Sequence, residues 1–453
     1  MNNNEKIPKK RRRLRITHIL IILLVAGFCF FVYYRLSLKS KLQARIDAIA
    51  AAGYPVTCAE LDKWYSIPEN VENAAYTIID AFSCYKKWDK DKSKPLPVVG
   101  RAELPACTEP LNKEMKSLIT QYIADNNEAL ELLHAGAAIE YCRYPVDLSA
   151  GFESKLPSLS EIRRGVFLLK LEAVLHAENG DGESALRSAI SSFGIAHSLA
   201  NEPCIVPQLV RIACQSFAVT TIEYCVNRVV PDDEQLVEFI ECVQNAERNS
   251  DISCAFVGER CMGLAFFRAP ESVNPDLING IPFRPVLELF KAAGLVDADA
   301  IIYFDIMDEY IQSIQLPLHK RQDAVRAINA KLQSTSKIHI LLHSLMPALS
   351  RITIMDLRNI AQWRTARTAL AIERYRLAAG KLPDTLADIV PAYLDAVPTD
   401  PFDGNELRYK KLEPGFVVYS IGEDMSDDGG KERRPRGTKE ESPNWDVTFI
   451  VAR

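Results

Sequence analysis

The sequence predicts a mainly α-helical protein with a transmembrane helix near its N-terminus and a small α+β module at its C-terminus. Three observations support this prediction: an apolar run follows a basic tail, helix-length amphipathic stretches fill the middle, and two short strand patterns lie near the end. We divide the chain into a basic cytoplasmic tail (1–15), a signal anchor (16–36), a helical body (37–350) and a C-terminal module (351–453).

The anchor is predicted from residues 16–34, which carry no acidic or basic side chain apart from His18. This run is long enough for one helix to cross a bilayer. Basic residues crowd 9–15 and are sparse after the run, so the tail should stay in the cytoplasm and the bulk of the chain should be periplasmic. Tyr33 and Tyr34 suit a membrane interface, and no small-residue cleavage motif follows promptly. We therefore expect a single-pass, uncleaved anchor in the cytoplasmic membrane of a bacterium.

Composition limits the possible partners. The chain has 453 residues, 48% of them hydrophobic, which suffices for a large core. Its net charge of −5 argues against a general nucleic-acid binder, because binding a polyanion needs a clustered positive field. Eleven cysteines are present, and the ten outside the anchor permit disulfides in an exported domain but equally suit buried free thiols.

The helical body is clearest between residues 160 and 249. Polar turns separate four helix-length stretches there, at 161–178, 183–200, 206–229 and 233–247. Such lengths with short turns predict antiparallel neighbours in a bundle or an irregular array of helical hairpins. No repeat at a fixed period is evident.

The second part of the body is less regular. Prolines divide residues 250–317 into short pieces before a helix expected at 297–314. Further helices are expected at 320–332 and from Ile338 onward, and Pro347 either kinks or ends the latter.

The C-terminal module starts with a helix that carries Trp363, Ala366, Leu370 and Leu377 on one face and ends at Gly380. A two-proline corner then follows at 397–404, strands are expected at 406–410 and 415–421, and an acidic glycine loop occupies 422–430.

This order resembles the C-terminal half of the major pseudopilins of type II secretion systems. The matching residues are Tyr375, Arg376, Gly380, Pro383, Pro398, Asp400, Pro401, Phe402, Gly404, Tyr409, Tyr419, Ser420, Gly422, Asp424, Gly429 and Gly430. The resemblance implies a long helix packed on a small antiparallel sheet. The Gly-Phe-Thr-Leu-x-Glu processing site of that family has no counterpart before Ile16, so we do not expect cleavage by a prepilin peptidase.

In that family the acidic loop binds calcium, and the resemblance implies Asp424 and Asp446 as its ligands here. Asp427 and Asp428 add hard carboxylate oxygens of the kind that calcium prefers. The alternative is a solvated Asp-Gly turn. A bound ion would be structural, because no base or nucleophile adjoins the loop. The charged stretch 431–441 is an insertion that the family pattern does not require.

Two further groups could carry chemistry. His339 and His343 lie one helical turn apart, a spacing that suits zinc, but the glutamate of the metalloprotease motif is missing, so core histidines are the alternative. Asp305, Asp308 and Glu309 share a helix and would line either a cleft or a solvated face. The sequence has no glycine-rich phosphate loop, nucleophile elbow or Cys-x-x-Cys pair, and so gives no positive sign of an enzyme or of a small-molecule substrate.

The leading hypothesis is therefore a membrane-anchored, extracytoplasmic structural or interaction protein without assignable catalysis. One alternative is an accessory component of a type II secretion or pilus-like system. A second alternative is an exported hydrolase with its site in the helical body, which would depend on His339, His343 or Asp305.

Overall fold

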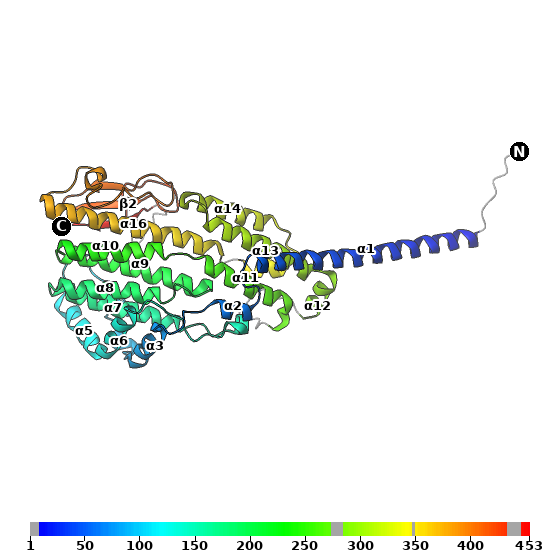
Figure 1. Cartoon of the computed structure of the whole chain (residues 1–453), viewed down its shortest axis with the longest axis horizontal. Helices are drawn as coiled ribbons and strands as arrows, with labels where there is room; N and C mark the ends of the chain where they lie inside the picture. The colour runs from blue at the N-terminus through cyan, green and yellow to red at the C-terminus, as the bar shows by residue number, and fades with distance from the viewer. Residues whose placement is uncertain (1–8, 273–283, 347–348, 433–444) are drawn as a thin grey trace.

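The computed structural model describes residues 9–272, 284–346, 349–432 and 445–453, with the backbone alone for 9–15. The protein is mainly helical, as predicted, with a helical body from which one long helix projects (Figure 1). The α-helices are α1 (Lys9–Ala51), α2 (Cys58–Trp64), α3 (Ala74–Cys84), α4 (Lys90–Ser93), α5 (Lys113–Asp125), α6 (Asn127–Ala137), α7 (Leu159–Glu178), α8 (Gly182–His197), α9 (Ile205–Arg228), α10 (Asp233–Arg248), α11 (Ser253–Arg268), α12 (Arg284–Ala293), α13 (Leu295–Ile314), α14 (Leu318–Ser334), α15 (Ile340–Leu345) and α16 (Leu349–Ala379). The strands are β1 (Arg408–Lys411), β2 (Phe416–Ser420) and β3 (Val447–Val451).

Helix α1 has two parts with different surroundings. Every side chain from 16 to 34 is exposed, which leaves the apolar run free of the body. From Arg35 onward one face packs: Leu38 and Ile49 are buried, and Leu42 lies against the core at the spacing of one helix face. The predicted N-terminal apolar helix that could span a membrane is therefore confirmed.

Within the described residues, two other helical regions are long and apolar enough to cross a membrane by length and composition. One is α9, whose most apolar window is 61% buried, and the other is formed by α15 and α16, with 50% of its window buried. Since protein neighbours already cover these two regions, α1 is the best candidate span.

The predicted antiparallel helices of the body are confirmed as α7, α8, α9 and α10 (Figure 1). Helices α3, α5 and α6 pack on one side of this array, and α16 packs against α9 and α10 on the other. Helix α10 begins at a capping box in which Asp232 and Gln235 satisfy each other's backbone amides. Helix α8 ends at His197, three residues before the predicted end, because residues 198–201 form turns.

The second part of the body consists of α11, α13, α14 and α15 around its own hydrophobic cluster. Helix α13 starts two residues before the predicted 297, and α14 spans all of the predicted 320–332. Pro347 lies outside the described residues, between the end of α15 and the start of α16.

The C-terminal module contains the expected long helix and small sheet. The strands form an antiparallel sheet in the order β1-β2-β3, with Tyr409 opposite Val418 and Val418 opposite Phe449. Helix α16 packs against β2 and β3. The first strand begins at Arg408, later than predicted, because Glu406 forms an isolated bridge with Thr399.

The edge of β3 is covered by side chains of α9. Asn227 Nδ2 donates to the Ile450 carbonyl at 2.8 Å, and Asn227 Oδ1 accepts from the Ala452 amide at 2.7 Å. Glu223 accepts from the Ile450 amide at 2.7 Å. A sheet edge is a row of unpaired amides and carbonyls, and these contacts satisfy it from the body. One hydrophobic cluster also joins α8, α9 and α10 to α16 and the sheet.

Candidate functional site

Three of the four aspartates of the predicted calcium site have partners of their own, and the Asp428 carboxylate has one oxygen without a hydrogen-bond partner in the described chain. Asp424 is exposed and accepts from the Ser426 amide at 3.1 Å. Asp427 faces the Arg408 guanidinium at 3.3 Å. Asp446 is buried and accepts from the Gly430 amide at 2.7 Å and, more weakly, from the Asp428 amide at 3.4 Å. The loop is therefore held by the Asp446 carboxylate acting on backbone amides.

Arg408 is the charge centre of this module. Its guanidinium contacts Asp400 at 2.9 Å and Asp403 at 2.5 Å, in addition to Asp427. Asp400 is buried and also accepts from the amides of Phe402 and Ile421, both at 2.9 Å. A single arginine thus contacts three carboxylates, and its one positive charge balances one of their three negative charges.

In the part of the chain that the structure describes, no group of three or more His, Cys, Asp or Glu side chains is placed to hold a metal ion. The Oδ2 atom of Asp428 is buried without a hydrogen-bond partner among described residues, which leaves one carboxylate oxygen available. As arranged, the four carboxylates do not converge, and the calcium site stays a prediction. Most of the insertion 431–441 lies outside the described residues.

The two histidines do not face a common point. His339 Nδ1 contacts Asp299 at 2.5 Å, and the second oxygen of Asp299 accepts from the Leu342 amide at 3.2 Å. Burial raises the pKa of Asp299, although the His339 contact opposes this. His343 Nε2 is buried without a hydrogen-bond partner among described side chains. The His339–Asp299 pair thus ties the start of α15 to α13.

The acidic residues of α13 also have separate cationic partners. Asp305 pairs with Arg45 of α1 at 2.7 Å, and Asp308 pairs with Arg260 of α11 at 3.1 Å. Glu309 pairs with Lys331 of α14. These carboxylates do not line one cleft, but each links α13 to a different neighbouring helix.

Sequence reasoning missed a buried ion cluster between α9, α14 and α16. Asp356 is 1% exposed, and neither of its carboxylate oxygens has a hydrogen-bond partner in the described chain. Its nearest cation is Arg321, at 3.7 Å. Burial raises the pKa of Asp356 to about 7, against the attraction of Arg211 and Arg321. Burial also lowers the pKa of Arg211.

Two cavities flank this cluster. One, of about 360 Å³, is lined by Glu140, His197, Gln215 and Asn249. The other, of about 280 Å³, is lined by Asp251 and Arg321. The cluster contacts the lining of both cavities. On the first side, Asn359 donates to Gln215 at 3.0 Å and Arg211 donates to the Asn249 carbonyl at 3.1 Å. On the second side, Arg321 itself lines the cavity.

A second interior network contains serine, histidine and glutamate. His134 Nδ1 lies 2.7 Å from Ser191 Oγ, and its Nε2 lies 2.8 Å from Glu172 Oε2. Ser188 donates to the same glutamate oxygen at 2.8 Å. These residue types resemble a nucleophile, base and orienting acid. However, Ser191 is only 7% exposed and lines neither of the two cavities above, so the network is best described as a polar link between α6, α7 and α8.

No local pattern in the sequence indicates these networks, because their contacts join residues of different helices, such as His134 with Glu172 and Gln215 with Asn359. The sequence left open whether the cysteines form disulfides or stay free. In the described chain all eleven are free thiols, and six of them are buried.

No family model, characterised protein or solved structure matches this chain. The likeness to pseudopilins therefore stays a prediction from the residues quoted above. What the described geometry offers is a set of polar links between helices, together with a projecting apolar helix.

Proposed function

We propose that this protein is a single-pass, membrane-anchored scaffold whose body lies outside the cytoplasmic membrane and presents the C-terminal sheet to a protein partner. The observation that carries the proposal is the continuity of α1, in which an exposed apolar stretch runs without a break into a stretch clamped to the body. At a rise of about 1.5 Å per residue, residues 16–34 measure about 28 Å, close to the thickness of a bilayer core.

The contacts between the second part of α1 and α13 would make the body follow the orientation of the span. Arg35 pairs with Asp297 at 2.7 Å and Arg45 pairs with Asp305 at the same distance, so two ion pairs about three helical turns apart hold α1 on α13. Two attachment points along one helix restrain rotation as well as translation. A scaffold needs this restraint in order to hold its distal surface at a defined height.

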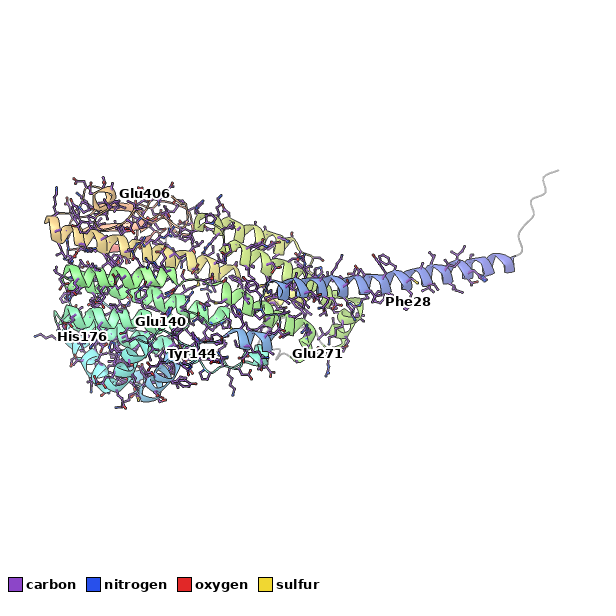
Figure 2. All side chains as sticks on the ribbon, viewed as in Figure 1. Phe28, Glu140, Tyr144, His176, Glu271 and Glu406 are labelled. Carbon is purple, nitrogen blue, oxygen red and sulfur yellow. The ribbon has the colours of Figure 1, made fainter. Side chains whose placement is uncertain are left out.

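The distal surface is the β1 side of the three-stranded sheet, where Lys410 and Lys411 are exposed, whereas β2 is buried along its whole length. The sheet lies toward the end of the body remote from the free part of α1, and Glu406 marks it in Figure 2. Because most of the length of the body separates the sheet from the free part of α1, the sheet is suited to contacts away from the lipid surface. The interior networks stiffen the helices between these two ends.

The proposal is tested by fractionation and topology mapping of the full chain carrying a C-terminal epitope tag. We expect the protein to stay with membranes after alkaline carbonate extraction and the tag to become accessible to protease in spheroplasts. A variant with Leu23 and Leu24 replaced by arginine is the matched control and should leave the membrane fraction. Release of the wild-type chain by carbonate, or a tag protected until the membrane is lysed, would contradict the proposal.

A second candidate function is an accessory of a type II secretion or pilus-like system. The packing of α16 on an antiparallel sheet favours it, since the pseudopilin resemblance implies that arrangement. Photo-cross-linking from Glu406 in cells that assemble such a system should then yield adducts with a pseudopilin. Adducts with unrelated proteins alone would remove this candidate and leave the scaffold proposal in place.

A further inference from the structure

Helix α12 presents apolar side chains to solvent beside the point where α1 leaves the body. Leu289 is 65% exposed and Val286 is 41% exposed, and the two lie three residues apart on one face. Leu287 points the other way and is buried in the cluster around α13. The helix is therefore held to the body by one face while an apolar face has no cover within the described chain.

The position of α12 along α1 is fixed by a close contact. Gly294, which joins α12 to α13, has φ +82°, and a Cβ added there would lie 2.3 Å from Arg35 Nη1 and 3.1 Å from Leu38 Cδ1. Arg35 directly follows the exposed apolar stretch that ends at Tyr34. The C-terminal end of α12 thus touches α1 just after its apolar run.

Charged side chains near α12 pair with one another. Lys291 contacts Glu271 at 2.6 Å and Glu288 at 3.4 Å, so the two glutamates offset its positive charge and the group keeps one net negative charge. Glu271 lies at the end of the body from which α1 projects (Figure 2). An amphipathic helix at this height can place its apolar face among the headgroups and upper acyl chains.

We propose that α12 is a membrane-contacting foot, whose Val286 and Leu289 insert into the bilayer surface beside the span. The inference rests on the proposed function in one respect, because it requires that residues 16–34 cross the membrane. The foot gives the body a second contact with the lipid, beside α1. Two contacts fix the tilt of the body, which a single helix would leave free.

The test uses the full chain in nanodiscs of phosphatidylethanolamine and phosphatidylglycerol, with the photoreactive residue benzoylphenylalanine at one position at a time. Leu289 tests the foot, and Phe28 in the middle of the apolar run tests the span. Leu377 is the matched control, because it is 45% exposed but lies at the far end of α16. Lipid adducts are detected by mass spectrometry.

We expect lipid adducts from positions 28 and 289 and none from 377. Val286→Asp should abolish the adduct from 289 and leave that from 28 unchanged. Adducts from 28 without adducts from 289 would overturn the foot and leave the span intact. A chain-to-chain adduct from 289 would also overturn it, by assigning the apolar face to a second copy. Loss of lipid adducts at 28 would instead remove the proposed function.

Discussion

Replacing Asp356 by asparagine should stabilise the folded protein, and the gain should grow as the pH rises. The carboxyl group is buried with no hydrogen-bond partner in the described chain, and burial raises its pKa from 3.8 to about 7. The folded state therefore favours the protonated form. Because the unfolded chain ionises at lower pH, stability is highest below the unfolded pKa of 3.8 and is lost as the pH rises toward 7.

The magnitude follows from the difference between the two pKa values. At about 1.4 kcal/mol per pKa unit, ionised Asp356 costs the folded state about 4 kcal/mol above neutral pH and about 2 kcal/mol near pH 5. The attraction of Arg211 and Arg321 is already contained in the raised pKa. Asparagine has the same shape as the neutral acid, so it should remove this cost.

The assay is thermal unfolding of the full chain in detergent, followed by tryptophan fluorescence. With an unfolding entropy of about 2 cal/mol/K per residue, 4 kcal/mol corresponds to a rise of about 4 °C in Tm near pH 8, and half of that near pH 5. Asp323→Asn on the exposed face of α14 is the matched control and should change Tm at neither pH. An equal change at both pH values, or a destabilised Asp356→Asn at pH 8, would refute the reasoning by showing a well-paired, ionised carboxylate.

Three further substitutions test other contacts. Asn227→Ala should cost roughly 2–4 kcal/mol, because the Ile450 carbonyl of β3 and the Ala452 amide just after it lose their partners. Hydrogen exchange should accelerate at the Ala452 amide, whereas Asn127→Ala, on an exposed pair, should leave that amide unchanged. Asp446→Ala should lower the free energy of unfolding by roughly 1–3 kcal/mol even in chelator, since the hydrogen bonds that its carboxylate accepts need no metal, and calorimetry with calcium on the wild type tests the predicted ion; a variant as stable as wild type in chelator would contradict the hydrogen-bonded closure of the loop. Asp305→Ala should lower the free energy of unfolding by no more than about 1 kcal/mol, because the ion pair with Arg45 is half-exposed. The same substitution should increase protease cleavage in the second half of α1. Unchanged cleavage would mean that apolar packing alone holds α1 on α13.

The predicted elements that the structure confirms are those with local signals. Turn residues mark helix ends within a few positions, as before α10, where the structure shows that Asp232 caps the first-turn amides. The apolar run of α1 is likewise legible from composition alone. Two strands were predicted for a similar reason, since Gly415 and the apolar residues after it define one of them, and β3 adds a third strand to the sheet.

The interior networks could not be predicted, because nothing in a local window indicates which polar residue will face which other. Asp356 reads as one polar position on a long helix, and Arg211 as one on another. The two side chains interact electrostatically only because α16 packs against α9, and the pattern of apolar residues does not specify that packing. The same holds for Arg408, whose three carboxylate partners belong to a corner and a loop that the sequence assigned to separate roles.

Helices α13 and α14 connect the span to the acidic loop through direct contacts. Helix α13 holds α1 through Asp305, and it holds α14 through a hydrogen bond of 3.1 Å from Tyr310 to Asn329. Helix α14 in turn reaches the loop, where Gln322 donates to the Glu423 carbonyl at 2.7 Å. The start of the acidic loop is also held by α16, where Arg358 pairs with Glu423 at 2.6 Å. A change in the loop, with or without calcium, would therefore act on both α14 and α16, so hydrogen exchange of these two helices is where a ligand of the loop should be detected.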